Sequence, residues 1–207
     1  CKAGATVYLL NPHYTVYDRE HDEDWTPFTP YLKEDPLMCS EYDKIEYYLE
    51  QLAGPVLRKR IDLVKAGQLP GKPCFLIIDE LPAIVKECAK NVPGFMEKLL
   101  REGRKYGIFL IVGSQDFLVK TIGTEGGAVR QCFRTGYYVG GDPTTARNLL
   151  EQGIPIPETR LGKGIAMLRC AATKKTIIAK IPYVDNASLY RLLGPSTFFQ
   201  SPPSRTP

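Results

Sequence analysis

The apolar residues of the chain form two kinds of pattern, and these alternate along its first half. Residues 5–10, 75–78 and 108–112 are apolar apart from Thr6 and rich in β-branched and aromatic residues, which is typical of strands buried on both faces. Between these runs, in residues 40–67 and 93–106, apolar residues recur at helical spacing. This alternation predicts an α/β fold with a mostly parallel sheet and helices on both of its faces.

Capping residues predict where the first helices begin and end. Ser40, followed by acidic residues, is typical of a helix start. Gly54-Pro55 predicts a break, because proline is favoured in the first turn of a new helix. Gly67 and Gly107 stand where the helical patterns stop, and glycine commonly ends a helix. The helices are therefore expected to end just before the next strand.

The second half of the chain is expected to hold a strand, a helix, an antiparallel hairpin and a short terminal helix. In that order these are residues 137–139, 142–152, 165–170 with 176–181, and 187–193. Residues 13–39 are acidic and proline-rich, which indicates an irregular surface loop. Residues 195–207 are rich in proline and serine and are expected to be a disordered tail or linker. One domain is therefore predicted over residues 1–194.

Composition narrows the class of protein without defining its function. Hydrophobic residues make up 43% and charged residues 24% of the chain, as in ordinary soluble globular proteins. The net charge of +4 is compatible with a polyanionic partner but too small to indicate one. The six cysteines form no CxxC motif and suggest reduced thiols of a cytoplasmic protein. No apolar run approaches the roughly 18 residues that cross a bilayer, so any membrane tether is expected in regions absent from these residues.

Polar residues follow each of the three apolar runs. Asn11 comes after the first, Asp79-Glu80 after the second and Ser114-Gln115 after the third. The carboxyl ends of parallel strands meet at one edge of a sheet, where ligands of α/β proteins bind. These side chains are therefore expected to share one edge.

Two interpretations fit the acidic pair. Asp79 and Glu80 could be acids at a helix N-terminus that satisfy backbone N–H groups. They could instead be a Walker B motif, in which apolar residues lead into Asp-Glu at the end of a strand, as in "CFLIIDE". In that case Asp79 would hold Mg²⁺ through water, because a hard cation prefers carboxylate oxygens. Glu80 would orient or deprotonate the water that attacks the γ-phosphate of ATP.

The third strand, in "GRKYGIFLIVGSQD", adds polar and basic candidates. Ser114 and Gln115 are placed to touch the γ-phosphate or the attacking water. Arg101, Arg104 and Lys105 precede the strand and could simply compensate the C-terminus of a helix. In a ring ATPase the same position faces the neighbouring subunit, where Arg104 would stabilise charge in trans.

The joint pattern resembles the FtsK/SpoIIIE–HerA–TraG group of P-loop DNA-translocating ATPases, and most closely the FtsK-like motor domains. The resemblance covers roughly residues 5–185, in the family's order. "ATVYLLNPH" resembles the family's strand with a DPK-like turn, and "KPCFLIIDELPAIV" its Walker B strand and short helix. "LLREGRKYGIFLIVGSQDF", "GGAVRQCFRTGYYV" and "ARNLLEQG…RLGKGIAMLRC" resemble the segments that follow.

The resemblance implies a RecA-like P-loop NTPase sheet that uses ATP and Mg²⁺ and moves double-stranded DNA through a homo-hexameric ring. Such motors grip the DNA backbone with little sequence specificity. Lys120 and Arg130, in the glycine-rich segment after the third strand, are the candidates for that contact. Arg101 and Arg134 are candidates for the subunit boundary.

Two departures limit the resemblance. The 207 residues contain no GxxxxGK[ST] phosphate loop, which an ATPase of this group needs to surround the β- and γ-phosphates. In the family this loop comes just before the first strand, so we expect it upstream of Cys1 and expect these residues alone to be inactive. Asn11 also stands where the family often has Asp, which makes a charged role at that position doubtful.

Two other functions remain compatible with the sequence. A conjugative coupling ATPase shares the chemistry but passes single-stranded DNA and protein. A non-catalytic assembly module of the same fold would keep the sheet and lose hydrolysis. Of these three possibilities, the motor that moves double-stranded DNA is the leading hypothesis.

Overall fold

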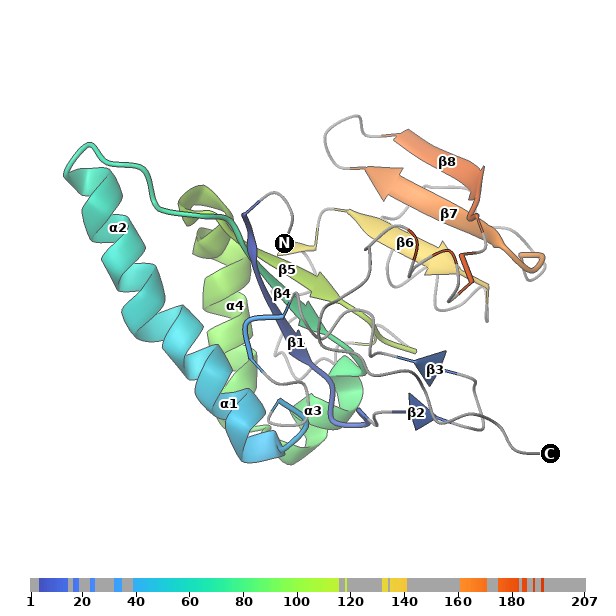
Figure 1. Cartoon of the computed structure of the whole chain (residues 1–207), viewed down its shortest axis with the longest axis horizontal. Coiled ribbons are helices and arrows are strands. Elements are labelled where there is room, and N and C mark those ends of the chain that lie inside the picture. Colours follow the sequence, from blue (N-terminus) through green and yellow to red (C-terminus); the bar gives the residue numbers. More distant parts are fainter. Residues whose placement is uncertain are drawn as a thin grey trace.

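The computed structural model describes residues 4–14, 17–18, 23–24, 32–34, 39–115, 118, 132–133, 135–140, 161–170, 175–182, 184–185, 188 and 191. Its centre is a three-stranded parallel sheet in the order β1-β4-β5 (Figure 1). These strands are β1 (Thr6–Leu10), β4 (Cys74–Ile78) and β5 (Ile108–Val112). They correspond to the three continuously apolar runs, so the predicted α/β class is confirmed.

The register of the parallel sheet brings the three strand ends to the same level. Leu10, Ile78 and Val112 are direct neighbours across the ladder. The residue that follows each of these therefore emerges at one edge of the sheet.

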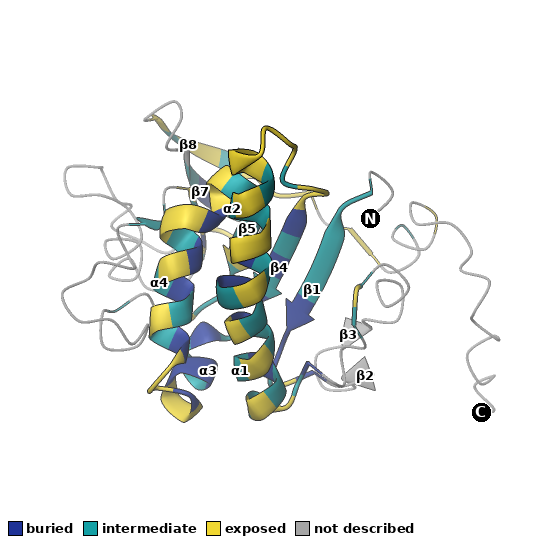
Figure 2. Cartoon of the chain, turned by 90° about the vertical axis from the view of Figure 1, so that its left-hand side faces the viewer, coloured by how far each residue is buried: buried dark blue, intermediate teal, exposed yellow. Residues whose placement is uncertain are grey.

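Three helices cover one face of this sheet. They are α1 (Tyr42–Gln51), α2 (Leu57–Lys65) and α4 (Val92–Glu102). The side chains that β4 buries completely, Leu76 and Ile78, alternate along the strand with the half-buried Phe75 and Ile77. Figure 2 shows that the buried residues gather between the sheet and these helices. The largest fully buried side chains are Leu10, Ile45, Leu49, Leu57, Leu76, Ile78, Leu81, Ile84, Met96, Leu99 and Ile108.

The predicted break at Gly54-Pro55 takes an unexpected form. Helices α1 and α2 are continuous through a π-helical turn, η2 (Leu52–Val56), which contains Pro55. Proline lacks an N–H and clashes with the carbonyl one turn earlier, and a widened turn is one way to accommodate it without ending the helix. The prediction of two separate helical segments was therefore wrong in its geometry, although Pro55 does mark the irregular position.

The helix predicted over 93–106 consists of two parts. α4 ends at Glu102, and a 3₁₀ turn, η3 (Gly103–Tyr106), leads into β5. At Gly103 an added Cβ would lie 3.1 Å from the carbonyl oxygen of Ile108, so the tight turn packs directly on the start of β5. Helix α3 (Leu81–Glu87) follows β4 and precedes α4.

A second sheet is antiparallel, with the order β6-β7-β8. Its strands are β6 (Gly136–Val139), β7 (Ile165–Cys170) and β8 (Lys175–Lys180). The predicted hairpin of β7 and β8 is confirmed, and β8 begins at residue 175, one residue earlier than predicted. β6 buries Tyr138 and exposes Tyr137 and Val139, the alternation typical of an antiparallel sheet with one solvated face.

Other predictions concern the acidic loop, the thiols and the later helices. Within residues 13–39 the structure has a short antiparallel pair, β2 (Tyr17–Asp18) and β3 (Glu23–Asp24). Cys39, Cys74 and Cys88 are buried free thiols, as expected for reduced core cysteines. None of the described helices is long and apolar enough to cross a membrane. The predicted helix over 142–152 and the tail from 195 lie outside the described residues, and so does most of 187–193.

Candidate functional site

Polar residues gather where the parallel strands end, because the ladder of the sheet continues one residue beyond each strand. The N–H of Asp79 donates to the carbonyl of Leu10 at 2.9 Å, and the N–H of Gly113 donates to the carbonyl of Ile78 at 2.8 Å. Asn11, Asp79 and Gly113 therefore lie side by side at the carboxyl edge. The predicted meeting of the β1 and β4 ends at this edge is what the structure shows.

The carboxylate of Asp79 is held on both of its oxygens. Oδ2 accepts a hydrogen bond from Nδ2 of Asn11 at 3.1 Å, and Oδ1 accepts one from the N–H of Glu80 at 3.1 Å. The Oδ1 atom of Asn11 accepts from the N–H of His13 at 2.8 Å. A backbone N–H can only donate, so this bond fixes the amide with its NH₂ toward Asp79. Asn11 is 5% exposed, which makes it a buried polar residue with both ends of its amide satisfied.

Gly113 brings backbone against the same carboxylate. A Cβ added at Gly113 would lie 2.9 Å from Oδ1 of Asp79, closer than real Cβ contacts. Any other residue here would have to displace the Asp79 side chain or the strand. The sequence analysis missed Gly113. The sequence pattern that could have identified it is a single glycine directly after an apolar strand. Such a glycine often marks a place where another group lies close against the backbone.

Glu80 has a strained backbone. With φ 51° and ψ 58° it is left-handed, and among the described residues it is the one non-glycine residue with positive φ. Such a conformation costs about 1–3 kcal/mol and persists where the surroundings impose it. Here the bond from Glu80 N–H to Asp79 and a bond from Leu81 N–H to the Gly113 carbonyl, at 3.1 Å, fix the turn. Strain of this kind clusters at functional sites.

The local geometry also weighs against a simple capping role for the two acids. Glu80 is the N-cap residue of α3, but its side chain makes no capping hydrogen bond, and the first turn of α3 contains no acid. The Asp79 carboxylate accepts from the N–H of Glu80, which lies outside the helix. The pair is therefore not arranged to satisfy the free N–H groups of α3.

The other predicted residues occupy different places. Ser114 is half-buried and Gln115 is exposed, and both directly follow the β5 end of the same edge. Arg101 and Arg104 precede β5 and thus lie at the opposite end of this strand from Ser114 and Gln115. The strand's five residues, at about 3.3 Å each, separate its two ends by about 16 Å. Within one chain Arg104 is therefore remote from Asp79, and its predicted role in trans stays a prediction.

The remaining predicted residues cannot be placed. Lys120, Arg130 and Arg134 lie outside the described residues. The predicted DNA contacts of Lys120 and Arg130, and the predicted subunit contact of Arg134, therefore stay predictions.

The oxygens of Asp79 and its neighbours suit a cation that is bound through its water molecules better than a cation that is coordinated directly by several side chains. Among the described residues, no three His, Cys, Asp or Glu side chains are grouped to enclose a metal ion. Each oxygen of Asp79 accepts one hydrogen bond and keeps capacity for a second, which water molecules of a hydrated Mg²⁺ could supply. The residues present therefore fit the Mg²⁺ half of a nucleotide site, whereas a GxxxxGK[ST] phosphate cradle is absent from the 207 residues.

The architecture is an α/β sheet with an acidic pair at the end of its central strand. A search for family models and for curated proteins similar to the sequence finds no match. Solved structures do share the fold, and those described next are ATPase domains of the FtsK/SpoIIIE type.

Three solved structures illustrate the likeness. The cytoplasmic domain of the Thermomonospora curvata type VII secretion ATPase EccC has a TM-score of 0.59 at 14% identity, over 97% of this chain and 26% of that chain. ATPases 2 and 3 of the same protein, in complex with a signal sequence peptide, have a TM-score of 0.60 at 13% identity, over 88% and 31%. EssC from Geobacillus thermodenitrificans, ATPases 2 and 3, has a TM-score of 0.54 at 12% identity, over 92% and 36%. This chain thus spans about a quarter to a third of those chains, and the likeness establishes the fold.

Proposed function

We propose that the chain is part of an FtsK-like motor ATPase that couples ATP hydrolysis to the movement of double-stranded DNA. The observation that carries the proposal is the acidic pair at the end of β4. One acid is fixed by Asn11 and by the backbone at Gly113, and the other stands in a strained turn. The fold shared with known ATPase domains supports it. A phosphate cradle would have to come from outside these 207 residues.

Each polar residue has a distinct task in this proposal. Bound Mg-ATP supplies the phosphoryl group and the metal charge. Asp79, held on both oxygens, orients the water shell of the cation. Glu80 accepts a proton from the attacking water or directs it, and its side chain makes no capping hydrogen bond to α3. Ser114 and Gln115 are placed to hold the γ-phosphate or that water.

The partners follow from the same proposal. A homo-hexameric ring would bring Arg104 of one subunit toward the nucleotide of the next, with Arg101 and Arg134 at the boundary between subunits. Lys120 and Arg130 would contact DNA phosphates without reading sequence. Such a motor would work in the cytoplasm, alone or tethered to a membrane through other regions.

A second candidate is an ATPase that moves polypeptide. It is favoured by the secretion ATPases among the structures that share the fold, one of which is described in complex with a signal sequence peptide. DNA-stimulated phosphate release by the full-length protein would favour the DNA motor, and release stimulated only by a polypeptide would favour the second candidate.

The central experiment is Glu80→Gln in the full-length protein. We expect ATP to bind and turnover to fall by about 10²–10⁴-fold, the usual contribution of a general base. Steady-state phosphate release and retention of labelled ATP measure the two effects. Glu87→Gln, which alters an exposed acid at the end of α3, is the matched control and should leave both unchanged. Turnover that survives Glu80→Gln would rule out Glu80 as the base.

A further inference from the structure

The turn after β1 explains only half of the chemistry of Asn11. Its Oδ1 atom accepts from the N–H of His13 at 2.8 Å, and its main-chain carbonyl accepts from the N–H of Tyr14 at 3.1 Å. Both bonds need an oxygen acceptor and nothing more. Aspartate forms turns of this kind as asparagine does, because its side-chain oxygen accepts from the same backbone N–H. The turn therefore accounts for an Asn or an Asp at position 11 and does not distinguish between them.

The amide nitrogen is the group that distinguishes the two residues. Nδ2 of Asn11 donates to Oδ2 of Asp79 at 3.1 Å, and an ionised aspartate has no donor for this bond. The side chain is 5% exposed, so the bond is made almost out of contact with solvent. The presence of an amide at position 11 is therefore explained by Asp79 and not by the turn.

The amide also limits the negative charge beside Asp79. Within the described part of the chain Asp79 forms no ion pair, and no three His, Cys, Asp or Glu side chains are grouped to hold a metal ion. The affinity of an oxygen site for a divalent cation rises with the number of charged ligands. Each oxygen of Asp79 already accepts a hydrogen bond. One carboxylate in this state is a weak cation site by itself.

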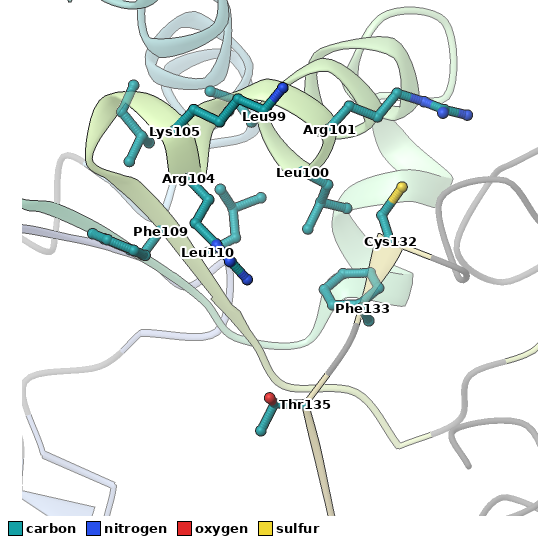
Figure 3. A pocket seen from close by; sticks show the side chains of 11 residues that line it. Leu99, Leu100, Arg101, Arg104, Lys105, Phe109, Leu110, Cys132, Phe133 and Thr135 are labelled. Carbon is teal, nitrogen blue, oxygen red and sulfur yellow. The ribbon is translucent and has the colours of Figure 1, made fainter. Parts of the chain in front are cut away.

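The pocket at the other end of β5 does not offer a competing cation site. It has a volume of about 500 Å³ and lies beside the start of the strand (Figure 3). Its lining includes Arg101, Arg104 and Lys105 together with leucine and phenylalanine side chains, and no acidic residue. The positive charge of this lining repels a free divalent cation. Cation binding to this sheet is therefore expected at its carboxyl edge.

We propose that Asn11 is a positioning residue that acts through Asp79 and keeps its site too weak to bind a divalent cation alone. The amide holds Oδ2 in place and withholds the second carboxylate that would complete the site. In the proposed ATPase, the phosphates of the nucleotide supply the missing negative charge, so the cation is bound together with the nucleotide. This last clause rests on the proposed function. The weakness of the site without nucleotide follows from the Asn11–Asp79 pair itself.

The test is Asn11→Asp in the full-length protein, titrated with Mn²⁺ in the absence of nucleotide. The substitution keeps the oxygen acceptor of the turn and replaces the donor by a second carboxylate. Electron paramagnetic resonance measures free Mn²⁺, at about pH 8 to limit the sharing of a proton between neighbouring carboxylates. The double variant with Asp79→Asn shows whether any bound Mn²⁺ lies at this site.

Asn91→Asp is the matched control. Nδ2 of Asn91 donates to Oε1 of Glu46, so this substitution also places a new carboxylate beside one that had accepted a hydrogen bond. Asn91 is exposed and directly precedes α4, whereas Asn11 is buried at the end of β1. The control therefore measures how much Mn²⁺ an added surface charge attracts by itself.

The expected results separate a role at the cation site from a purely structural one. Without nucleotide the unmodified protein binds Mn²⁺ with a Kd above about 1 mM, the weak end of protein sites for divalent cations. Asn11→Asp binds it about tenfold more tightly or better, because two adjacent carboxylates now face the ion. The control and the double variant behave like the unmodified protein. Mn²⁺ also raises the melting temperature of Asn11→Asp more than that of the unmodified protein, since a ligand stabilises the state that binds it.

Several results would overturn the proposal. One is tight Mn²⁺ binding by the unmodified protein without nucleotide that is lost in Asp79→Asn. Others are a folded Asn11→Asp variant with no gain, an equal gain in Asn91→Asp, or an Asn11→Asp variant that does not fold even with Mn²⁺ present to relieve the repulsion. Adding ATP to the unmodified protein tests the proposed function separately. If ATP does not tighten Mn²⁺ binding while the nucleotide-free results are as expected, the ATPase proposal is contradicted and the role of Asn11 is not.

Discussion

At the scale of single residues, the structure places three backbone or side-chain groups around one carboxylate. Asp79 accepts from the Asn11 amide and from the Glu80 N–H, and Gly113 closes its third side. The buried residue beside Asp79 is the amide Asn11 and not a second acid, and this difference stabilises the Asp79 carboxylate. Asn11 can donate to Asp79, whereas an ionised aspartate there would repel it.

Gly113→Ala should disturb this carboxylate. The added methyl would lie 2.9 Å from Oδ1 of Asp79, so either the side chain rotates or the strand shifts. A misplacement of about 1 Å at a reacting centre costs on the order of 10²-fold in rate, and we expect a loss of this size in ATP turnover by the full-length protein, with a higher Mg²⁺ requirement. Gly94→Ala is the control, since open space surrounds that position in α4. An unchanged Mg²⁺ dependence for Gly113→Ala would show that Asp79 does not orient the metal.

At the scale of elements, side chains tie the helices to the sheet at its amino edge. The Arg60 guanidinium on α2 donates to the carbonyls of Tyr106, Gly107 and Lys72 at 2.9, 3.2 and 2.8 Å. These carbonyls directly precede β5 and β4, so one cation joins α2 to the start of two strands. Because η3 ends at Tyr106, the same bonds also help to fix the turn that carries Arg104.

A second attachment joins α1 to the segment 32–34. The N–H of Lys33 donates to the Val7 carbonyl of β1 at 2.7 Å, and the ring of Tyr48 on α1 packs 5.9 Å from that of Tyr8. Burial, together with the negative charge and hydrogen bond of Glu34, raises the pKa of Tyr48 to about 12. The neutral phenol is therefore the form that the folded protein favours.

This pKa predicts a loss of stability in alkali. The folded pKa of Tyr48 is higher than its ordinary value of 10, so its contribution is complete below pH 10 and is lost as the pH rises toward 12. In Tyr48→Phe, the decrease in the free energy of unfolding between pH 10 and 12 should be smaller, as measured by chemical denaturation. Tyr137→Phe, at an exposed position, serves as the control. Identical alkaline profiles for the Tyr48 variant and the unmodified protein would contradict the assignment.

At the scale of the whole molecule, sequence patterns predicted the parts better than their arrangement. Strands such as 75–78 and 108–112 were clear because continuous apolar runs have few other uses in a soluble protein. The roles of Asn11 and Gly113 were missed, because they depend on the register between strands that are far apart in the sequence. The separation of β6 from the parallel sheet also depends on long-range pairing, which local patterns do not encode.

The left-handed turn at Glu80 lowers the stability of the fold and holds the carboxylate that the proposed reaction needs. Glycine adopts φ 51° without the penalty of about 1–2 kcal/mol that a Cβ incurs. Glu80→Gly should therefore melt higher than Glu80→Ala by roughly 2–8 °C, as measured by differential scanning calorimetry. Equal melting temperatures would indicate a relaxed turn. If the glycine variant has the higher melting temperature, stability alone does not explain why residue 80 is a glutamate. The reason would then be the chemical role of its carboxylate.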